Sequence, residues 1–157
     1  MDDPVASRIA GLLDSAERIL GLTVVVHDHA GLLVDMAIPD RHFHRHIFCR
    51  EGRTDGSAHD RRCQEHCRHA IPGRLAEAGI PMVHTCWKGG SEACAAVLRE
   101  GVPVFTLFAG VARSGPAPPA GLDPGSRRVW RSLPVADPAR LQDAALILQA
   151  LGRSMLA

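Results

Sequence analysis

Residues 82–111 read MVHTCWKGGSEACAAVLREGVPVFTLFAGV, the strongest strand signal in the chain. Three apolar segments rich in β-branched and aromatic residues have the length of single strands: 82–87, 93–98 and 102–111. Glu100 and Gly101 provide a turn between the last two. The stretch therefore predicts three consecutive strands, of which the last two form a hairpin.

Towards the N-terminus, the pattern predicts a helix and a second hairpin. Apolar residues recur at helical spacing over residues 5–20, and Gly21 ends the pattern. A β-branched run at 22–27 and an apolar run at 32–37 flank a turn signal at 28–31. These segments predict an N-terminal amphipathic helix followed by two antiparallel strands.

The middle and the end of the chain favour helices. Residues 59–79 predict a helix that Pro72 and Gly73 interrupt, so a kink or two short helices are expected. Residues 114–137 are rich in proline and predict a loop. Residues 138–157 return to helical spacing and predict an amphipathic C-terminal helix.

This order predicts an α+β fold with a five-stranded antiparallel sheet, helices to one side of it, flanking N- and C-terminal helices and a helical middle segment. The arrangement resembles that of PAS-like sensory domains. At 157 residues the chain is expected to form a single domain. Its parts are the N-terminal helix 1–21, the core 22–113, the proline-rich loop 114–137 and the C-terminal helix 138–157.

Charge and composition narrow the classes of partner. The net charge of +1 gives no indication of a nucleic-acid partner. No apolar run approaches the length of a membrane span, and Met-Asp-Asp at the start lacks the basic residues of a signal peptide. We therefore expect a cytoplasmic protein without membrane contact, in which thiols stay reduced.

Four of the five cysteines lie between residues 49 and 86. Cys63 and Cys67 are four positions apart, which places their sulfurs on one face of the expected helix, about 6 Å from each other. Cys49 precedes this helix and Cys86 follows it, in an expected strand. We expect these four thiols to converge on a metal centre, whereas Cys94 lies in a strand outside the group and is assigned to the core.

Four thiolates are a complete ligand set for zinc or for an iron–sulfur cluster. Structural zinc usually uses two close pairs of cysteines, and this chain has a single close pair within a helix. The spacing favours an iron–sulfur cluster of the 4Fe–4S type, with zinc as the alternative. Cysteine also buries well as a small apolar residue, so purely structural thiols stay open as a further alternative.

Histidines crowd the same region of the chain. One set alternates in a polar segment, where a solvated loop is favoured over a zinc or nickel face: His42, His44 and His46. His66 and His69 lie near the two helical cysteines, and either could replace one of them as a ligand. His84 precedes Cys86 by two residues, so in a strand both side chains point the same way.

An organic ligand is the competing occupant of this region. Its expected walls are Phe48, His84 and Phe105. The sequence contains no Cys-x-x-Cys redox pair, phosphate-binding glycine loop or His-Glu-x-x-His motif. We therefore expect no catalytic residues, and a thiol-dependent enzyme is kept as a second alternative.

Three segments resemble the PocR-type sensory domain, a PAS-like module found in AraC-type regulators and sensor histidine kinases. They are residues 24–31 (VVVHDHAG), Phe48-Cys49 followed by Arg62-Cys63, and residues 79–89 (GIPMVHTCWKG). The resemblance covers about residues 5–113. It departs from the family pattern at Cys67, where the family often has an acidic residue.

This resemblance implies a sensor that binds a small organic molecule or carries a cofactor, rather than a catalyst. With an iron–sulfur cluster on the four cysteines, we expect the sensory domain of a bacterial signalling or transcription regulator, responding to redox state, oxygen or a small ligand. The resemblance also implies an output domain or partner outside this chain. The amphipathic terminal helices predict a homodimer. The alternative function is a sensor of a small organic molecule, with thiols that are structural or hold zinc.

Overall fold

The computed structural model describes residues 4–33, 41 and 44–157, in which four strands form one antiparallel sheet in the order β1–β4–β3–β2. The strands are β1 (Val24–Asp28), β2 (Met82–Thr85), β3 (Ser91–Arg99) and β4 (Val102–Ala112). Glu100 and Gly101 form the β3–β4 turn, with φ values of 52° and 78°. The predicted hairpin and its turn are therefore confirmed.

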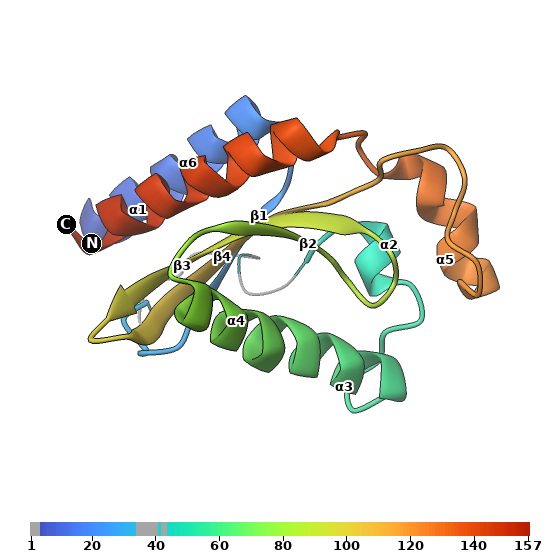
Figure 1. Ribbon diagram of the computed structural model, residues 1–157, viewed down its shortest axis with the longest axis horizontal. Helices are drawn as coiled ribbons and strands as arrows, with labels where there is room; N and C mark the ends of the chain where they lie inside the picture. Colours follow the sequence, from blue (N-terminus) through green and yellow to red (C-terminus); the bar gives the residue numbers. More distant parts are fainter. Residues whose placement is uncertain (1–3, 34–40, 42–43) are drawn as a thin grey trace.

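Helices cover both faces of this sheet (Figure 1). They are α1 (Pro4–Leu20), α2 (Ile47–Arg50), α3 (Ala58–Gln64), α4 (Ile71–Ala78), α5 (Pro124–Val129) and α6 (Pro138–Leu156). Helices α1 and α6 lie side by side on one face, and α3 and α4 lie on the other. The expectation of helices on one side only is wrong, because both faces of the central strands are apolar.

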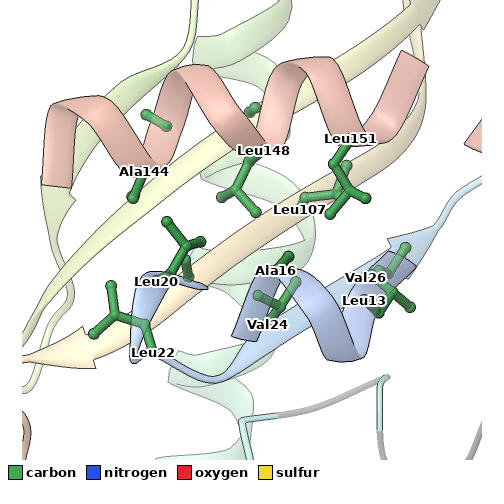
Figure 2. Packing of buried hydrophobic residues seen from close by; sticks show 14 of the residues in the cluster. Leu13, Ala16, Leu20, Leu22, Val24, Val26, Leu107, Ala144, Leu148 and Leu151 are labelled. Atoms are coloured by element: carbon green, nitrogen blue, oxygen red, sulfur yellow. The ribbon is translucent and has the colours of Figure 1, made fainter. Parts of the chain in front are cut away.

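The alternation of side chains along β3 and β4 explains the three layers. Ala95 and Val97 of β3 and Leu107 of β4 belong to the core beneath α1 and α6. Figure 2 shows this core, in which Leu148 of α6 packs with residues of α1 and the sheet. Residues at the alternate positions of these strands, such as Phe108, point to the other face of the sheet and form a second core with α4. Burial on both faces accounts for the nearly continuous apolar runs in the sequence.

The α+β class, the terminal helices and the helical middle segment are confirmed, and the described residues contain four strands rather than five. The additional strand was predicted over residues 32–37, most of which lie outside the described residues. Leu32 and Leu33, at its start, form a turn.

The middle helix changes geometry without breaking. Between α3 and α4 the segment Glu65–Ala70 is π-helical, and the amide of Ile71 donates to the carbonyl of His66, five residues earlier. Pro72 follows in the first turn of α4, where its missing N–H is tolerated. The irregularity therefore lies before Pro72 rather than at the predicted Pro72–Gly73 break. Such π-helical segments frequently occur at functional sites.

The proline-rich segment 114–137 contains more regular structure than predicted. It includes α5, which Asp123 caps, and a short 3₁₀ helix, Trp130–Ser132. Trp130 is buried and packs edge-on against Phe48 of α2, with 5.5 Å between ring centroids. Within the described chain, no helix has both the length and the apolarity needed to cross a membrane.

Candidate functional site

A cavity of about 710 Å³ lies on the α3–α4 side of the sheet. Helices α2 and α3, the π-helical segment and the turn after β2 supply most of its lining. All four cysteines predicted as ligands line this cavity: Cys49, Cys63, Cys67 and Cys86. The structure therefore brings together thiols from separate elements of the fold.

Local sequence explains how two of these cysteines reach the cavity. His46 caps α2 by accepting the amide of Phe48, and the buried Phe48 ring anchors the helix beside Cys49. Cys86 opens a tight turn in which its amide donates to the carbonyl of Gly90 at 2.8 Å. Gly90 has no room for a side chain, since a Cβ would collide with Val111.

N–H groups favour negative charge on two of the thiols. The backbone amides of Lys88 and Gly90 act to lower the pKa of Cys86, against the larger effect of burial. The indole Nε1 of Trp87 donates to Cys63 Sγ at 3.3 Å. Arg62 covers the Trp87 ring at 4.6 Å from its centroid, which helps to hold the indole in place. N–H donors of this kind stabilise negative charge on sulfur.

Lys88, the only lysine in the chain, is buried at the same cavity. Its Nζ donates to the carbonyl of Phe48 and lies 4.5 Å from the centroid of the Phe48 ring. Burial lowers the pKa of Lys88, and the neighbouring thiols act in the opposite direction. The ammonium group is thus placed to balance negative charge on Cys49 and Cys86.

Three of the four thiols are held neutral in the absence of a metal. Burial, followed by the nearby charge of Glu92, raises the pKa of Cys49 and Cys67, and raises that of Cys86 to about 12. Cys63 contributes to each of these shifts, which means that the four sulfurs are close enough to interact electrostatically. A metal bound here must therefore displace the thiol protons.

A tighter group of possible ligands lies at the base of the cavity. The ligand atoms of His44, Cys67 and Glu92 all lie within 4.8 Å of one another, so this buried group could hold a metal ion. Among the described residues, the four cysteine sulfurs do not form a comparable tight group. From the sequence, His44 is expected in a solvated loop, and Glu92 is not among the expected ligands. The available signal was a lone acidic residue at the start of an apolar strand.

Two further histidines extend this group. His84 Nε2 lies 3.1 Å from Glu92 Oε2, and His84 Nδ1 lies 3.1 Å from His66 Nε2. Burial acts to raise the pKa of Glu92, but His44 and His84 outweigh it and bring that pKa to about 2. Glu92 is therefore a carboxylate at neutral pH, with only 1% of its surface exposed.

The other predicted site residues fall in different places. Phe48 lines the cavity, and His84 lies behind Glu92. Phe105 is in the core beneath α1 and α6, on the opposite face of the sheet, because its position on β4 has the other parity. Cys94 is buried outside the cavity lining, as expected, and donates from Sγ to the carbonyl of Met82 at 3.4 Å.

The remaining histidines take separate positions. His42 lies outside the described residues, and His69 is exposed on the π-helical segment. His59 packs edge-on against Trp87, with 4.8 Å between ring centroids. Of the two members of the alternating set that the structure describes, His44 and His46, only His44 lines the cavity.

The arrangement of His44, Cys67 and Glu92 differs from that of a cysteine-dependent catalytic triad. Such triads use one ring nitrogen of histidine for the nucleophile and the other for the acid. Here His44 Nε2 faces both Cys67 Sγ, at 4.0 Å, and Glu92 Oε1, at 3.6 Å. His44 Nδ1 is buried without a hydrogen-bond partner. A shared nitrogen is the arrangement expected around a common ligand rather than along a proton relay.

Comparison of this chain with family models, with curated proteins and with solved structures finds no match. Its functional assignment therefore depends on the residues and geometry of the cavity.

Proposed function

We propose that this chain is a sensory domain that binds an iron–sulfur cluster, of the 4Fe–4S type, through Cys49, Cys63, Cys67 and Cys86. One observation carries the proposal: these four thiols come from separate parts of the chain and line one cavity of about 710 Å³. Iron–sulfur clusters are held by four cysteine thiolates.

The spacing of the sulfurs supports a cluster over a single zinc ion on the same cysteines. Four sulfurs at about 2.3 Å from one zinc ion lie about 3.8 Å from each other. Among the described residues, no set of three cysteine sulfurs falls within 4.8 Å. A centre that contains several metal ions spans a wider set of ligands.

The surroundings of the sulfurs also suit an anionic centre. The indole of Trp87 donates to Cys63, the turn amides act to lower the pKa of Cys86, and Lys88 places a positive charge beside the thiols. Hydrogen bonds to the sulfurs and nearby charge are the means by which proteins tune cluster potentials. The cluster would supply one-electron chemistry, which suits a redox or oxygen signal.

The sensory role rests on the resemblance of three segments to PocR-type domains and on the route from the cavity to the terminal helices. Val111 of β4 and Glu92 of β3 line the cavity, and α6 packs against both strands from the other face. A change in the cavity would thus reach α6 and an output partner. We further propose a homodimer through α1 and α6, on which Ile19 and Leu146 are exposed. Light scattering tests this, and a monomer contradicts it.

Anaerobic purification followed by iron, sulfide and visible-absorption measurements tests cluster binding. We expect about four iron and four sulfide per chain. Cys49→Ser, Cys63→Ser and Cys86→Ser should each lower the cluster content. Cys94→Ser is the control, because Cys94 is a buried cysteine outside the cavity lining. Colourless, iron-free protein from strictly anaerobic material, or equal losses in the control, would rule out the proposal.

A small organic molecule is the second candidate occupant. The volume of about 710 Å³ falls within the range of ligand pockets, and the lining combines Phe48 and Val111 with the cation Lys88. A thermal-shift screen of colourless protein with short alcohols, diols and carboxylates tests this candidate. A ligand that binds the native state raises the melting temperature, and a screen without any shift argues against these classes.

A further inference from the structure

The His44–Cys67–Glu92 group has distances that suit ligands of one ion. His44 Nε2 lies 3.6 Å from Glu92 Oε1 and 4.0 Å from Cys67 Sγ. The first distance is too long for a good hydrogen bond between nitrogen and oxygen. Ligands bound to one zinc ion at about 2.0–2.3 Å lie about 3.3–3.8 Å from each other. The spacing is therefore close to that of three ligands around a single metal.

His84 provides a second and independent observation. Its Nε2 and Glu92 Oε2 approach to 3.1 Å, yet both atoms are buried and neither makes a hydrogen bond of acceptable geometry. Polar atoms this deeply buried are normally satisfied, and an ion bound beside both atoms would supply the missing partner. The other nitrogen of His84 contacts His66 at 3.1 Å, the kind of outer hydrogen bond that orients histidine ligands.

The burial of Glu92 points the same way. Its carboxyl group has only 1% of its surface exposed. A carboxylate in such a place is costly unless a cation or several hydrogen bonds compensate it. A divalent cation held between His44, Cys67 and Glu92 would provide that compensation.

We propose that His44 Nε2, Cys67 Sγ and the Glu92 carboxylate bind a single divalent metal ion of the zinc class. His84 Nε2 lies outside this group of three but 3.1 Å from Glu92 Oε2, and it completes the set as the fourth ligand when the ion binds. The mixture of sulfur, nitrogen and oxygen donors suits zinc. Binding replaces the S–H bond of Cys67 by a metal–sulfur bond, and the proton leaves to solvent.

This site is separate from the four-cysteine site except for Cys67. It does not rest on the proposed cluster, because its other three ligands take no part in cluster binding. One Cys67 thiolate cannot serve both centres in these two arrangements, so the two metal-bound forms exclude each other on one chain. A chain without its cluster is the form expected to take up zinc.

Cobalt titration of the reduced, chelator-treated full chain tests the inference under anaerobic conditions. We expect one Co²⁺ per chain with thiolate-to-cobalt absorption, and displacement of cobalt by Zn²⁺. Glu92→Gln and His44→Gln should each weaken cobalt binding by at least about tenfold. Glu65→Gln and His69→Gln are the matched controls, since both residues are exposed on the π-helical segment, and they should bind cobalt normally.

A triple variant, Cys49→Ser/Cys63→Ser/Cys86→Ser, separates this inference from the proposed function. It lacks three of the cluster ligands, and it should still bind one cobalt ion. If Glu92→Gln or His44→Gln fails to fold, this variant together with Cys67→Ser decides the result. Retained binding in the triple variant and lost thiolate absorption in Cys67→Ser support the site. Cobalt binding that survives Glu92→Gln and His44→Gln, or disappears in the triple variant, would overturn it.

Discussion

His27 places an imidazole on β1 where the fold opposes its protonation. The side chain is 7% exposed, and its ring packs against Phe108 with 5.2 Å between centroids. Its Nδ1 donates to the carbonyl of Cys67 at 3.3 Å. Burial, followed by the neighbouring charges of His44 and Arg68, lowers the pKa of His27 from 6.5 to about 3.

The consequence is a loss of stability on acidification of the metal-free protein. Below pH 6.5 the unfolded chain binds a proton at His27 that the folded protein excludes until about pH 3. Since the unfolded state binds more protons, the free energy of unfolding falls as the pH drops through this interval. The whole interval is worth at most about 5 kcal/mol, and about 2 kcal/mol of it is lost by about pH 5.

Urea unfolding with a chelator present, at about pH 7.5 and about pH 5, measures this effect in the wild type and in His27→Gln. His29 and His46 also have lowered pKa values because of burial, so acid destabilises both proteins. Only the wild type carries the additional His27 contribution. We expect its stability advantage over the variant to shrink by about 2 kcal/mol. Parallel losses in the two proteins, or an NMR titration of folded His27 near pH 6.5, would refute the reasoning.

Three further substitutions test the packing, each by chemical denaturation. Leu148→Ala opens a fully buried site beneath α6 and should lower the free energy of unfolding by about 2–5 kcal/mol, whereas the exposed Leu146→Ala should cost less than about 0.5 kcal/mol; equal effects would contradict the described packing. Asp137→Ala removes the carboxylate that caps α6 at 2.8 Å and should cost about 1 kcal/mol; unchanged stability would show that this cap is dispensable. Gly90→Ala places a methyl group against Val111 and should lower the free energy of unfolding by about 1–3 kcal/mol. Adding Val111→Ala to the same chain should relieve part of this loss. If the effects of the two substitutions on stability are strictly additive, the contact is refuted.

The four cysteines of the cavity could be grouped from the sequence because they lie within one helical segment or close to its ends in the chain. Cys63 and Cys67 share a face through helical periodicity, and Cys49 and Cys86 lie just before and just after that helix in the chain. Residues that lie shortly before and after a helix in the chain often lie close to that helix in the folded protein. The shared cavity of these four residues follows from this local arrangement.

The sequence did not predict the positions of His44 and Glu92, because their burial beside Cys67 results from contacts between distant parts of the chain. The polar run around His44 is typical of an exposed loop, yet the folded chain buries its ring beside Cys67 and Phe108. Glu92 is one acidic residue beside an apolar strand, and no local pattern distinguishes a buried carboxylate from an exposed one. Phe105 illustrates the same difficulty, since a shift of one residue on a strand moves a side chain to the other face of the sheet.

The amino-acid sequence by itself determined the elements and their class: the helix periodicity of α1 and α6, the apolar strands β3 and β4, and the turn at Glu100 and Gly101. These features depend on backbone preferences and on residues a few positions apart. Only the tertiary structure decided that helices cover both faces, that the middle helix passes through π geometry, and that His44 and Glu92 meet at Cys67. Burial and side-chain proximity at these places result from packing between segments far apart in the chain, which local periodicity does not encode.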